Sequence, residues 1–305
     1  MFVLNPDPFL LPSYRICPFQ TADVARNQNL PEDEYAISYF DNRFGKGNWQ
    51  YTYNGREAIA LALENYGLKK DDLVTIITTS QNFYISSCVT SQIESLCRWN
   101  REILPETKLI FVNHEFGYPY LEMEKLVATG LPIIEDCCTT FFSNDTSGKL
   151  GKYGDFSVYS FPKFFPVQIG GLLVSNKSKA TKTSQLTLEE RNYIQNSVSF
   201  HLKNETELLA KRKQNFEYAA AKFAEAGFEL RFKSEAATVS SVLLLRNNSV
   251  VDDLNALKTF LYKHGIQNSV FYGEDAFFIP NHQNLSPTEI DYFYEVVLYY
   301  IKNCN

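Results

Sequence analysis

The sequence predicts an α/β fold, with a three-layer α/β/α large domain that precedes a small α+β domain. From about residue 50 to 175, short and almost wholly apolar segments alternate with segments whose apolar residues recur at helical spacing. Apolar strands of this kind lie buried on both faces of a mostly parallel sheet. The composition turns polar over 178–190, and a long helical pattern follows. We therefore expect a large domain over 1–200 and a small domain over 201–305.

The large domain is expected to contain five strands. Their ranges are 73–79, 109–112, 131–136, 156–160 and 171–175. The helices between them are expected to run from the N-cap Asn54 onward, over 84–103 and over 119–128. In parallel sheets, ligands bind beyond the carboxyl ends of the strands. This rule marks Asp136 and the residues that follow Thr79 and Ser160 as candidates.

The small domain is expected to begin with a long helix over 204–226. This helix should end at Gly227, because glycine commonly follows the last turn of a helix. The remaining elements are strands over 228–232, 239–245 and 269–272 and helices over 251–264 and 287–301. The longest basic cluster of the chain, Lys211–Lys213, is expected on one face of the long helix.

The composition restricts the class of protein. The 305 residues include 29 Lys and Arg against 35 Asp and Glu, a net charge of −6, so we expect no nucleic-acid partner. No apolar run approaches the roughly 18 residues that span a membrane, and residues 1–6 do not have the pattern of a signal peptide. The six cysteines form no C-x-x-C pair, which favours reduced thiols and a cytoplasmic location.

Two features at the ends of predicted elements could hold a charged ligand. Asn54-Gly55-Arg56 opens a helix, where free backbone N–H groups and the helix dipole favour a phosphate. A helix that is merely well capped is the alternative. Glu135-Asp136 ends an apolar strand, so a carboxylate there can pair with a cation. The alternative is a solvated charge or a helix N-cap.

A third feature is Lys163, which lies in an aromatic and proline-rich stretch before Gly170-Gly171. A lysine in such surroundings can act as an amine nucleophile and then as a base. The alternative is a lysine that extends from an exposed loop. His114-Glu115 invites a metal hypothesis, but adjacent strand residues point to opposite faces and no second histidine is near. We expect a loop that lines the pocket, and no metal site.

Several segments of this chain are similar to motifs that occur in the same order in one enzyme family. They are Asn54–Ala58 (family Ser-Gly-Thr/Arg-x-Ala), Asn82-Phe83 (Thr-Phe or Thr-Trp), 112–119 (Leu-Tyr-Gly-x-Pro), Ile134–Cys138 (Val-Ile-Glu-Asp-Ala-Ala), Gly154–Phe161 (Gly-Asp-x-x-x-Phe-Ser-Phe) and 279–285 (Leu-Pro-x-His-x-x-Leu). The spacing from Lys163 to Gly170-Gly171 also fits. The chain thus resembles the DegT/DnrJ/StrS family of fold-type-I pyridoxal-phosphate-dependent aminotransferases, most of which act on sugars.

The resemblance implies pyridoxal 5'-phosphate as the cofactor and assigns roles to the matching positions. Lys163 would bind the cofactor covalently and move a proton, and Asp136 would keep the pyridine nitrogen protonated. The cofactor would otherwise be held by Asn54, Gly55, Arg56 and Ser160 at its phosphate, by Phe83 on its ring and by Thr139 near its 3-hydroxyl. Two departures stand out. Ser160 and Lys163 are two residues closer than in the family, and Thr139 replaces the usual Gln or His.

The resemblance further implies a homodimer that moves an amino group from an amino acid, usually glutamate, to a keto sugar, often nucleotide-linked. The pathway would be the biosynthesis of amino sugars or cell-surface polysaccharide. The Gly-x-Asn-x-Arg/Met segment, which reaches across the dimer in relatives, is not found in this chain. Two alternatives therefore stay open: a cofactor-binding protein that does not transaminate, and a sugar dehydratase with the same cofactor. A simple dinucleotide-binding domain is disfavoured because no G-x-G-x-x-G follows a strand.

Overall fold

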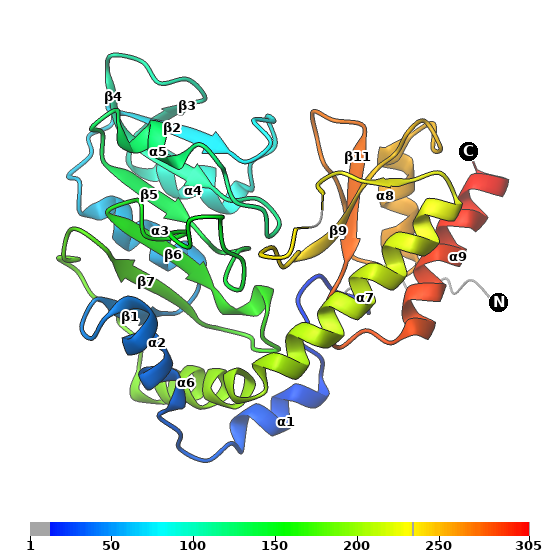
Figure 1. Ribbon diagram of the computed structural model, residues 1–305, viewed down its shortest axis with the longest axis horizontal. Helices are drawn as coiled ribbons and strands as arrows, with labels where there is room; N and C mark the ends of the chain where they lie inside the picture. The colour runs from blue at the N-terminus through cyan, green and yellow to red at the C-terminus, as the bar shows by residue number, and fades with distance from the viewer. Residues whose placement is uncertain (1–12, 234, 305) are drawn as a thin grey trace.

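The computed structural model describes residues 13–233 and 235–304, which form two sheets. The larger sheet has seven strands and the smaller has four. Figure 1 shows the two sheets in separate halves of the molecule, with a long helix that crosses from one half to the other. The expectation for residues 1–6 lies outside the described residues.

The seven-stranded sheet has the order β1-β7-β6-β5-β4-β2-β3. Its strands are β1 (Trp49–Thr52), β2 (Leu73–Thr78), β3 (Arg98–Asn100), β4 (Thr107–Asn113), β5 (Ile133–Asp136), β6 (Phe156–Ser160) and β7 (Gly171–Ser175). Strands β3, β2, β4, β5 and β6 are mutually parallel, and β7 runs antiparallel to β6 and β1. The five predicted strands are confirmed. The carboxyl ends of β4, β5 and β6 therefore meet at one edge.

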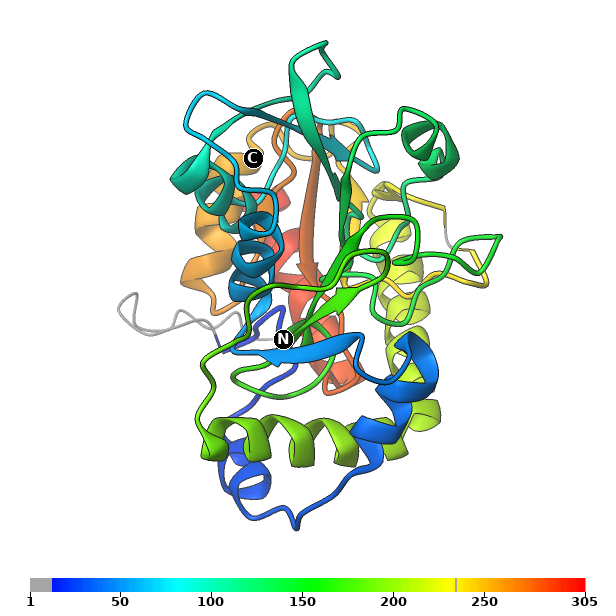
Figure 2. The same cartoon turned by 90° about the vertical axis from the view of Figure 1, so that its left-hand side faces the viewer.

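Helices cover both faces of this sheet. Successive side chains of a strand point to opposite faces, so these almost wholly apolar strands present apolar side chains on both. Leu109 and Phe111 of β4 pack with the helices on one face, and Ile110 and Val112 pack with those on the other. The first face carries α3 (Gly55–Glu64) and α4 (Ser87–Leu96), and the second carries α5 (Met123–Val127), α2 (Tyr35–Phe44) and α6 (Leu188–Lys203). Figure 2 shows the sheet between these layers. The predicted three-layer α/β/α arrangement is confirmed.

Two predicted helices are shorter than expected. The helix expected over 84–103 is α4, which ends at Leu96, because Arg98–Asn100 pair with β2 as an edge strand. The helix expected over 119–128 is α5, which begins only at Met123. Before it, the Tyr120 N–H donates to His114 Nδ1 at 3.0 Å. In both cases tertiary hydrogen bonds outweigh local helical preference.

Several elements carried too weak a pattern to be predicted. They are α1 (Ala22–Gln28), α2, β1, α6 and β11 (Ala276–Pro280). Helix α6 begins at the end of the polar stretch 178–190, where Thr187 and Glu190 form a capping box. Its apolar side packs with α2 against Leu172 and Val174 of β7.

The second half of the molecule is a four-stranded antiparallel sheet covered by three helices. Its elements are α7 (Glu205–Glu225), β8 (Glu229–Leu230), β9 (Val242–Arg246), α8 (Leu254–Lys263), β10 (Ser269–Val270), β11 and α9 (Pro287–Asn303). The strand order is β10-β11-β9-β8. Gly227 follows α7 with a φ of +95°, and Gly265 follows α8 with a φ of +77°. Both helices thus end before a glycine, where the sequence predicted their ends. Tyr14 pairs with Ile266, so the first described segment joins this half. The boundary at residue 200 stays a prediction.

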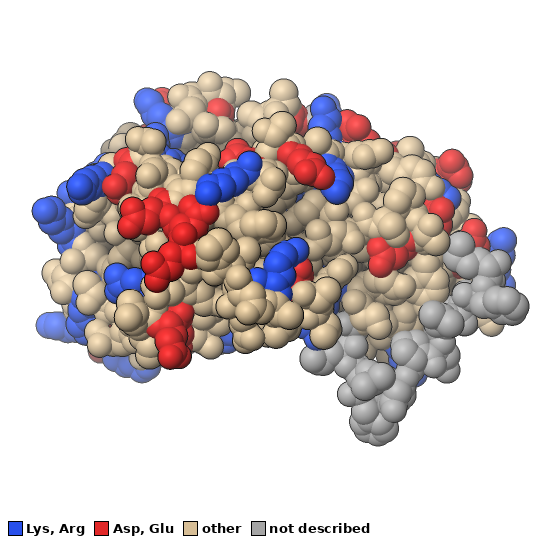
Figure 3. Space-filling model, turned by 90° about the horizontal axis from the view of Figure 1, so that it is seen from below, with Lys and Arg blue, Asp and Glu red and all other residues tan. Residues whose placement is uncertain are grey.

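Charged side chains of both signs lie on the surface of the molecule. Figure 3 shows the molecule from below, on the side of α6, where acidic and basic side chains are interspersed. Within 13–233 and 235–304, no helix is both long and apolar enough to cross a bilayer.

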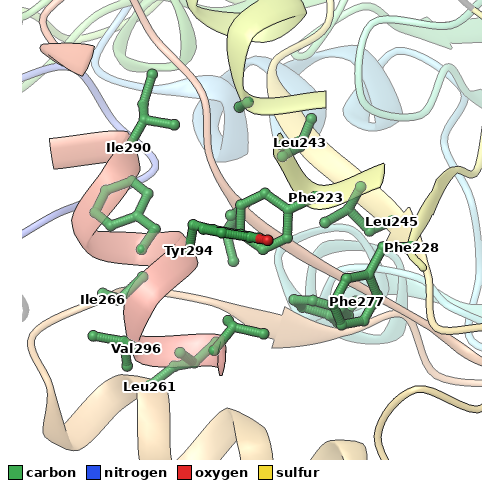
Figure 4. Packing of buried hydrophobic residues seen from close by; sticks show 14 of the residues in the cluster. Phe223, Phe228, Leu243, Leu245, Leu261, Ile266, Phe277, Ile290, Tyr294 and Val296 are labelled. Carbon is green, nitrogen blue, oxygen red and sulfur yellow. The ribbon is translucent and has the colours of Figure 1, made fainter. Parts of the chain in front are cut away.

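The core of the second half should depend on Phe223 of α7, whose ring is fully buried beside Phe228 and Tyr294 (Figure 4). We expect Phe223→Ala to lower the free energy of unfolding by about 3–5 kcal/mol, since it removes contacts and leaves a cavity. Leu188→Ala, at a side chain 73% exposed, should change it by less than about 0.5 kcal/mol. Urea unfolding followed by circular dichroism measures both, and equal midpoints for the two variants would contradict this packing.

Candidate functional site

One cavity of about 590 Å³ lies at the carboxyl edge of the large sheet and is closed on one side by the second half of the molecule. Its walls include the turn before α3, the ends of β4, β5 and β6, and residues of β9 and β11. Of the eight residues predicted for the site, all but Phe83 line this cavity. They are Asn54, Gly55, Arg56, Asp136, Thr139, Ser160 and Lys163.

The start of α3 forms one end of the cavity. Asn54 Oδ1 accepts the Glu57 N–H at 3.0 Å and so caps the helix as predicted. The N–H groups of the first turn, at Gly55 and Arg56, have no partner within the helix and carry the positive end of its dipole. A Cβ on Gly55 would lie 2.9 Å from Cys138 Sγ and 3.1 Å from Ser160 Cβ. Glycine thus lets the helix start approach the ends of β5 and β6, an arrangement that suits an anion.

Asp136 ends β5 and is only 5% exposed. Its Oδ1 accepts the Cys138 N–H at 3.0 Å, and its Oδ2 accepts from Asn113 Nδ2 at 3.3 Å. Burial raises the pKa of Asp136, and the Cys138 hydrogen bond and the nearby His114 and Lys163 oppose this rise. A carboxyl group held in this way next to a cavity is suited to pair with a cationic group of a ligand.

Glu135 points to the opposite face and has a structural role. Its carboxylate accepts the N–H groups of Gly151, Tyr153 and Gly154 at 2.7–3.0 Å. His114 Nε2 lies 3.3 Å from the same carboxylate. The ligand atoms of His114, Glu135 and Cys137 lie within 4.8 Å of one another. Because four donors already occupy the Glu135 oxygens, this cluster supports the end of β5 and offers a metal no free carboxylate.

Lys163 is half-buried at the end of the 3₁₀ helix η1 (Phe161–Lys163), directly after β6. Its charge lowers the pKa of Asp136 and of Cys138, so its amine lies near the end of β5. Among the described residues, no hydrogen bond or ion pair engages its Nζ. The neighbouring phenylalanines Phe161, Phe164 and Phe165 are fully buried in the core beneath the turn and do not line the cavity.

The glycine pair after Lys163 holds this turn against the sheet. The Phe161 N–H donates to the Gly170 carbonyl at 3.1 Å. Gly170 has a φ of +122°, and a Cβ there would lie 2.8 Å from the ring of Phe161. A Cβ on Gly171 would lie 2.6 Å from the Tyr159 carbonyl. Both positions therefore require glycine, as the spacing predicted.

The prediction for Phe83 disagrees with the structure. Its side chain is 84% exposed, and Tyr84 lines the cavity in its place. Asn82 explains the difference, because its Oδ1 accepts the Phe83 N–H and its Nδ2 donates to the Tyr272 carbonyl of the second half. This bracing turns Phe83 outward. Thr139 lines the cavity, and its hydroxyl donates to the His114 carbonyl at 2.7 Å.

The loop at His114-Glu115 lines the cavity, as the sequence predicted, and it places the polar side chain of Glu115 in the cavity wall. Glu115 is 4% exposed, its Oε2 accepts the Ser80 N–H at 2.6 Å, and its Oε1 has no partner. Burial raises the pKa of Glu115. Phe116, the next residue, has a φ of +55°, which is unusual for a residue with a side chain. The adjacent His-Glu pair was the available signal, and it indicated a loop that lines the pocket.

Comparison with known proteins adds a family and a fold. Residues 90–190 match the model of the DegT/DnrJ/EryC1/StrS aminotransferase family. A GDP-perosamine synthase from Escherichia coli O157:H7 is 31% identical over 166 residues, a match that covers 46% of this chain and 44% of that synthase. The aligned part is thus less than half of the curated relative.

Solved structures match over nearly the whole chain. The aminotransferase TlmJ from Streptoalloteichus hindustanus has a TM-score of 0.72 at 16% identity, with 96% of this chain and 100% of that chain covered. A candidate sugar aminotransferase from Streptococcus pneumoniae, solved as apo, PLP and PMP forms, has a TM-score of 0.71 at 15% identity in the apo form, with 98% of each chain covered. At these identities the likeness shows the fold. By residues 90–190, by its relative and by its fold, this chain resembles the DegT/DnrJ/EryC1/StrS aminotransferase family, as the sequence motifs predicted.

Proposed function

We propose that this protein is a pyridoxal-phosphate-dependent aminotransferase that moves an amino group from an amino acid to a keto sugar. The observation that carries the proposal is the composition of one cavity. It brings together the anion site at Gly55 and Arg56, the buried carboxyl group of Asp136 and the amine of Lys163. Such a set of residues would hold three groups of a ligand. The anion site would hold a phosphate ester, Asp136 a protonated ring nitrogen and Lys163 an aldehyde.

The residues in the cavity fit this cofactor. The N–H groups of the first turn of α3, with the hydroxyl of Ser160 and the side chains of Asn54 and Arg56, would bind its phosphate. Thr139 would lie near its ring hydroxyl, while Phe83 would require a movement of the 81–86 loop to stack on the ring. When bound, pyridoxal phosphate supplies a conjugated ring that takes up an electron pair from the substrate carbon.

Asp136 and Lys163 would divide the proton chemistry between them. The Asp136 carboxylate would hold a proton on the ring nitrogen, a pairing that also relieves the burial of its charge. Lys163 Nζ would accept the proton from the α-carbon of the amino donor and would later supply a proton to the former carbonyl carbon of the acceptor. Ser241, Val242 and Phe278, from the second half of the molecule, would exclude water from this side of the cavity.

The proposal also includes glutamate as the amino donor and a keto sugar as the acceptor. It further includes a homodimer and a cytoplasmic role in biosynthesis. The support is the resemblance to a family of aminotransferases and to a relative named as a GDP-perosamine synthase. The site itself supports transfer at a small carbonyl compound through Lys163 and Asp136.

The first test uses absorption spectroscopy. Purified protein with added pyridoxal phosphate should develop a band near about 420 nm that Lys163→Ala lacks, because the amine of Lys163 is the group that reacts with the cofactor aldehyde. Lys211→Ala should keep the band, since Lys211 is exposed and pairs with Glu207 on the surface. A wild-type protein without any such band would sink the enzyme proposal.

Glutamate then separates transamination from the two alternatives. Its addition to the loaded wild-type protein should remove the band, because the amino group passes to the cofactor. A spectrum that no amino acid changes would favour a protein that binds the cofactor without transamination, or a dehydratase.

The second test concerns turnover in Asp136→Asn. We expect this variant to bind the cofactor within about tenfold of wild type but to lose at least about 100-fold in kcat, because an amide cannot keep the ring nitrogen protonated. Single-turnover conversion with glutamate measures the loss. Turnover that equals the wild-type value would remove Asp136 from the proposed mechanism.

The third test concerns stability without cofactor. Burial raises the pKa of Asp136 above its unfolded value, so its contribution to stability is greatest below the unfolded pKa and falls as pH rises through the folded pKa. At pH 7, well above the unfolded pKa, this rise in pKa therefore costs stability, and Asp136→Asn should unfold at a higher temperature than wild type. The difference should shrink toward pH 4. Thermal unfolding of both proteins at the two pH values measures it, and an equal difference at both would contradict the burial of this charge.

A further inference from the structure

Arg212 of α7 is the largest side chain among the fully buried residues, at 1% exposure. The sequence predicted it on one face of the helix together with Lys211 and Lys213. Both lysines do lie on the surface, where they pair with Glu207 and Glu217. Successive helix residues are about 100° apart, so the middle residue of the run turns inward.

The buried guanidinium donates only to neutral acceptors. Its Nε donates to the Ser240 carbonyl at 3.1 Å, and its Nη1 donates to Gln283 Oε1 at 2.9 Å. Its Nη2 donates to the carbonyls of Lys163 at 3.1 Å and Ser241 at 3.4 Å. The ring of Phe164 lies 4.7 Å from the guanidinium carbon. A buried charge is costly unless it is well hydrogen-bonded, and no carboxylate pairs with it among the described ion pairs.

Gln283 completes this arrangement. Its Nε2 donates to the Phe164 carbonyl at 2.8 Å, while its Oε1 accepts from Arg212. The carbonyls of Lys163 and Phe164, two consecutive residues, are therefore both held by side chains of the second half. We name Arg212 and Gln283 together the turn clamp.

We infer that Arg212 is a positioning residue, which fixes the amine of Lys163 through the backbone of its turn. The inference rests on the proposed function, in which Lys163 is the reacting group. No described hydrogen bond holds Lys163 Nζ, so the backbone of the turn sets where the amine points. Reactive groups must be held to within about 0.5 Å of their productive geometry. A displacement of about 1 Å can lower the reaction rate about 100-fold.

Asn215 provides a matched control on the same helix. It is 6% exposed, and its Nδ2 donates to the carbonyls of His282 and Leu285 at 2.9 and 2.8 Å. It thus ties α7 to the segment that carries Gln283, and its side chain makes no described hydrogen bond to Lys163 or Phe164. A general weakening of this interface would affect Asn215 variants as much as variants of the turn clamp.

The experiment compares the full-length wild-type protein with Arg212→Met, Gln283→Leu and Asn215→Leu. Pyridoxal phosphate is titrated into each protein. The readouts are the rate at which the band at about 420 nm forms and the affinity for the cofactor, and urea unfolding measures stability. We expect Arg212→Met to form the band about 100-fold more slowly than wild type and to bind the cofactor more weakly, and Gln283→Leu to show smaller effects of both kinds. Asn215→Leu should lose comparable stability yet keep the affinity within about threefold of wild type.

The outcomes separate the two claims. If the wild-type protein shows no band, the proposed function fails. If the wild-type protein shows the band, two results would overturn the inference. One is that the turn-clamp variants bind the cofactor as wild type does. The other is that Asn215→Leu loses as much affinity as Arg212→Met. If Arg212→Met fails to fold, the cofactor affinities of Gln283→Leu and Asn215→Leu are compared in the same way.

Discussion

The candidate site depends on the parallel pairing of β4, β5 and β6. Their register places Asn113 beside Asp136, and Asp136 beside Val158 of the strand that ends in Ser160. Polar side chains that follow three buried strands thus meet at one edge of the sheet. Gly55 then allows the start of α3 to approach this edge, since any side chain there would meet Cys138 and Ser160. Without this pairing the anion site, the carboxyl group and the lysine turn would not share a cavity.

The second half of the molecule completes the site from the other side. The turn clamp holds the backbone after β6, while the Ser241 N–H and the Ser240 hydroxyl both donate to the Phe116 carbonyl in the cavity wall. Gln283 is the residue of the 279–285 motif that holds this backbone, although it does not line the cavity itself. Within the same motif, His282 Nε2 donates to the Arg15 carbonyl at 3.1 Å, and burial lowers the pKa of His282 to about 3. A neutral His282 beside the Arg212 charge is consistent with a role in packing.

Sequence reasoning predicted the parts of the site whose geometry is local. A cap such as Asn54 and a strand end such as Asp136 are determined by neighbouring residues, and the glycine pair by its own backbone. The outward position of Phe83 could not be predicted, because its direction depends on a hydrogen bond from Asn82 to Tyr272, which is almost two hundred residues away in the chain. Arg212 was misplaced for a related reason. Three consecutive basic residues indicate a solvated surface, and only the packing of α7 shows which of them turns inward.

The central claim is that the amine of Lys163 is the group that binds pyridoxal phosphate. The most direct measurement is borohydride reduction of the protein after incubation with a limiting amount of the cofactor, followed by peptide mass spectrometry. The account predicts that the added mass of the reduced cofactor is found on the peptide that contains Lys163. Label spread evenly over exposed lysines such as Lys211 and Lys213, with none preferred at Lys163, would contradict it.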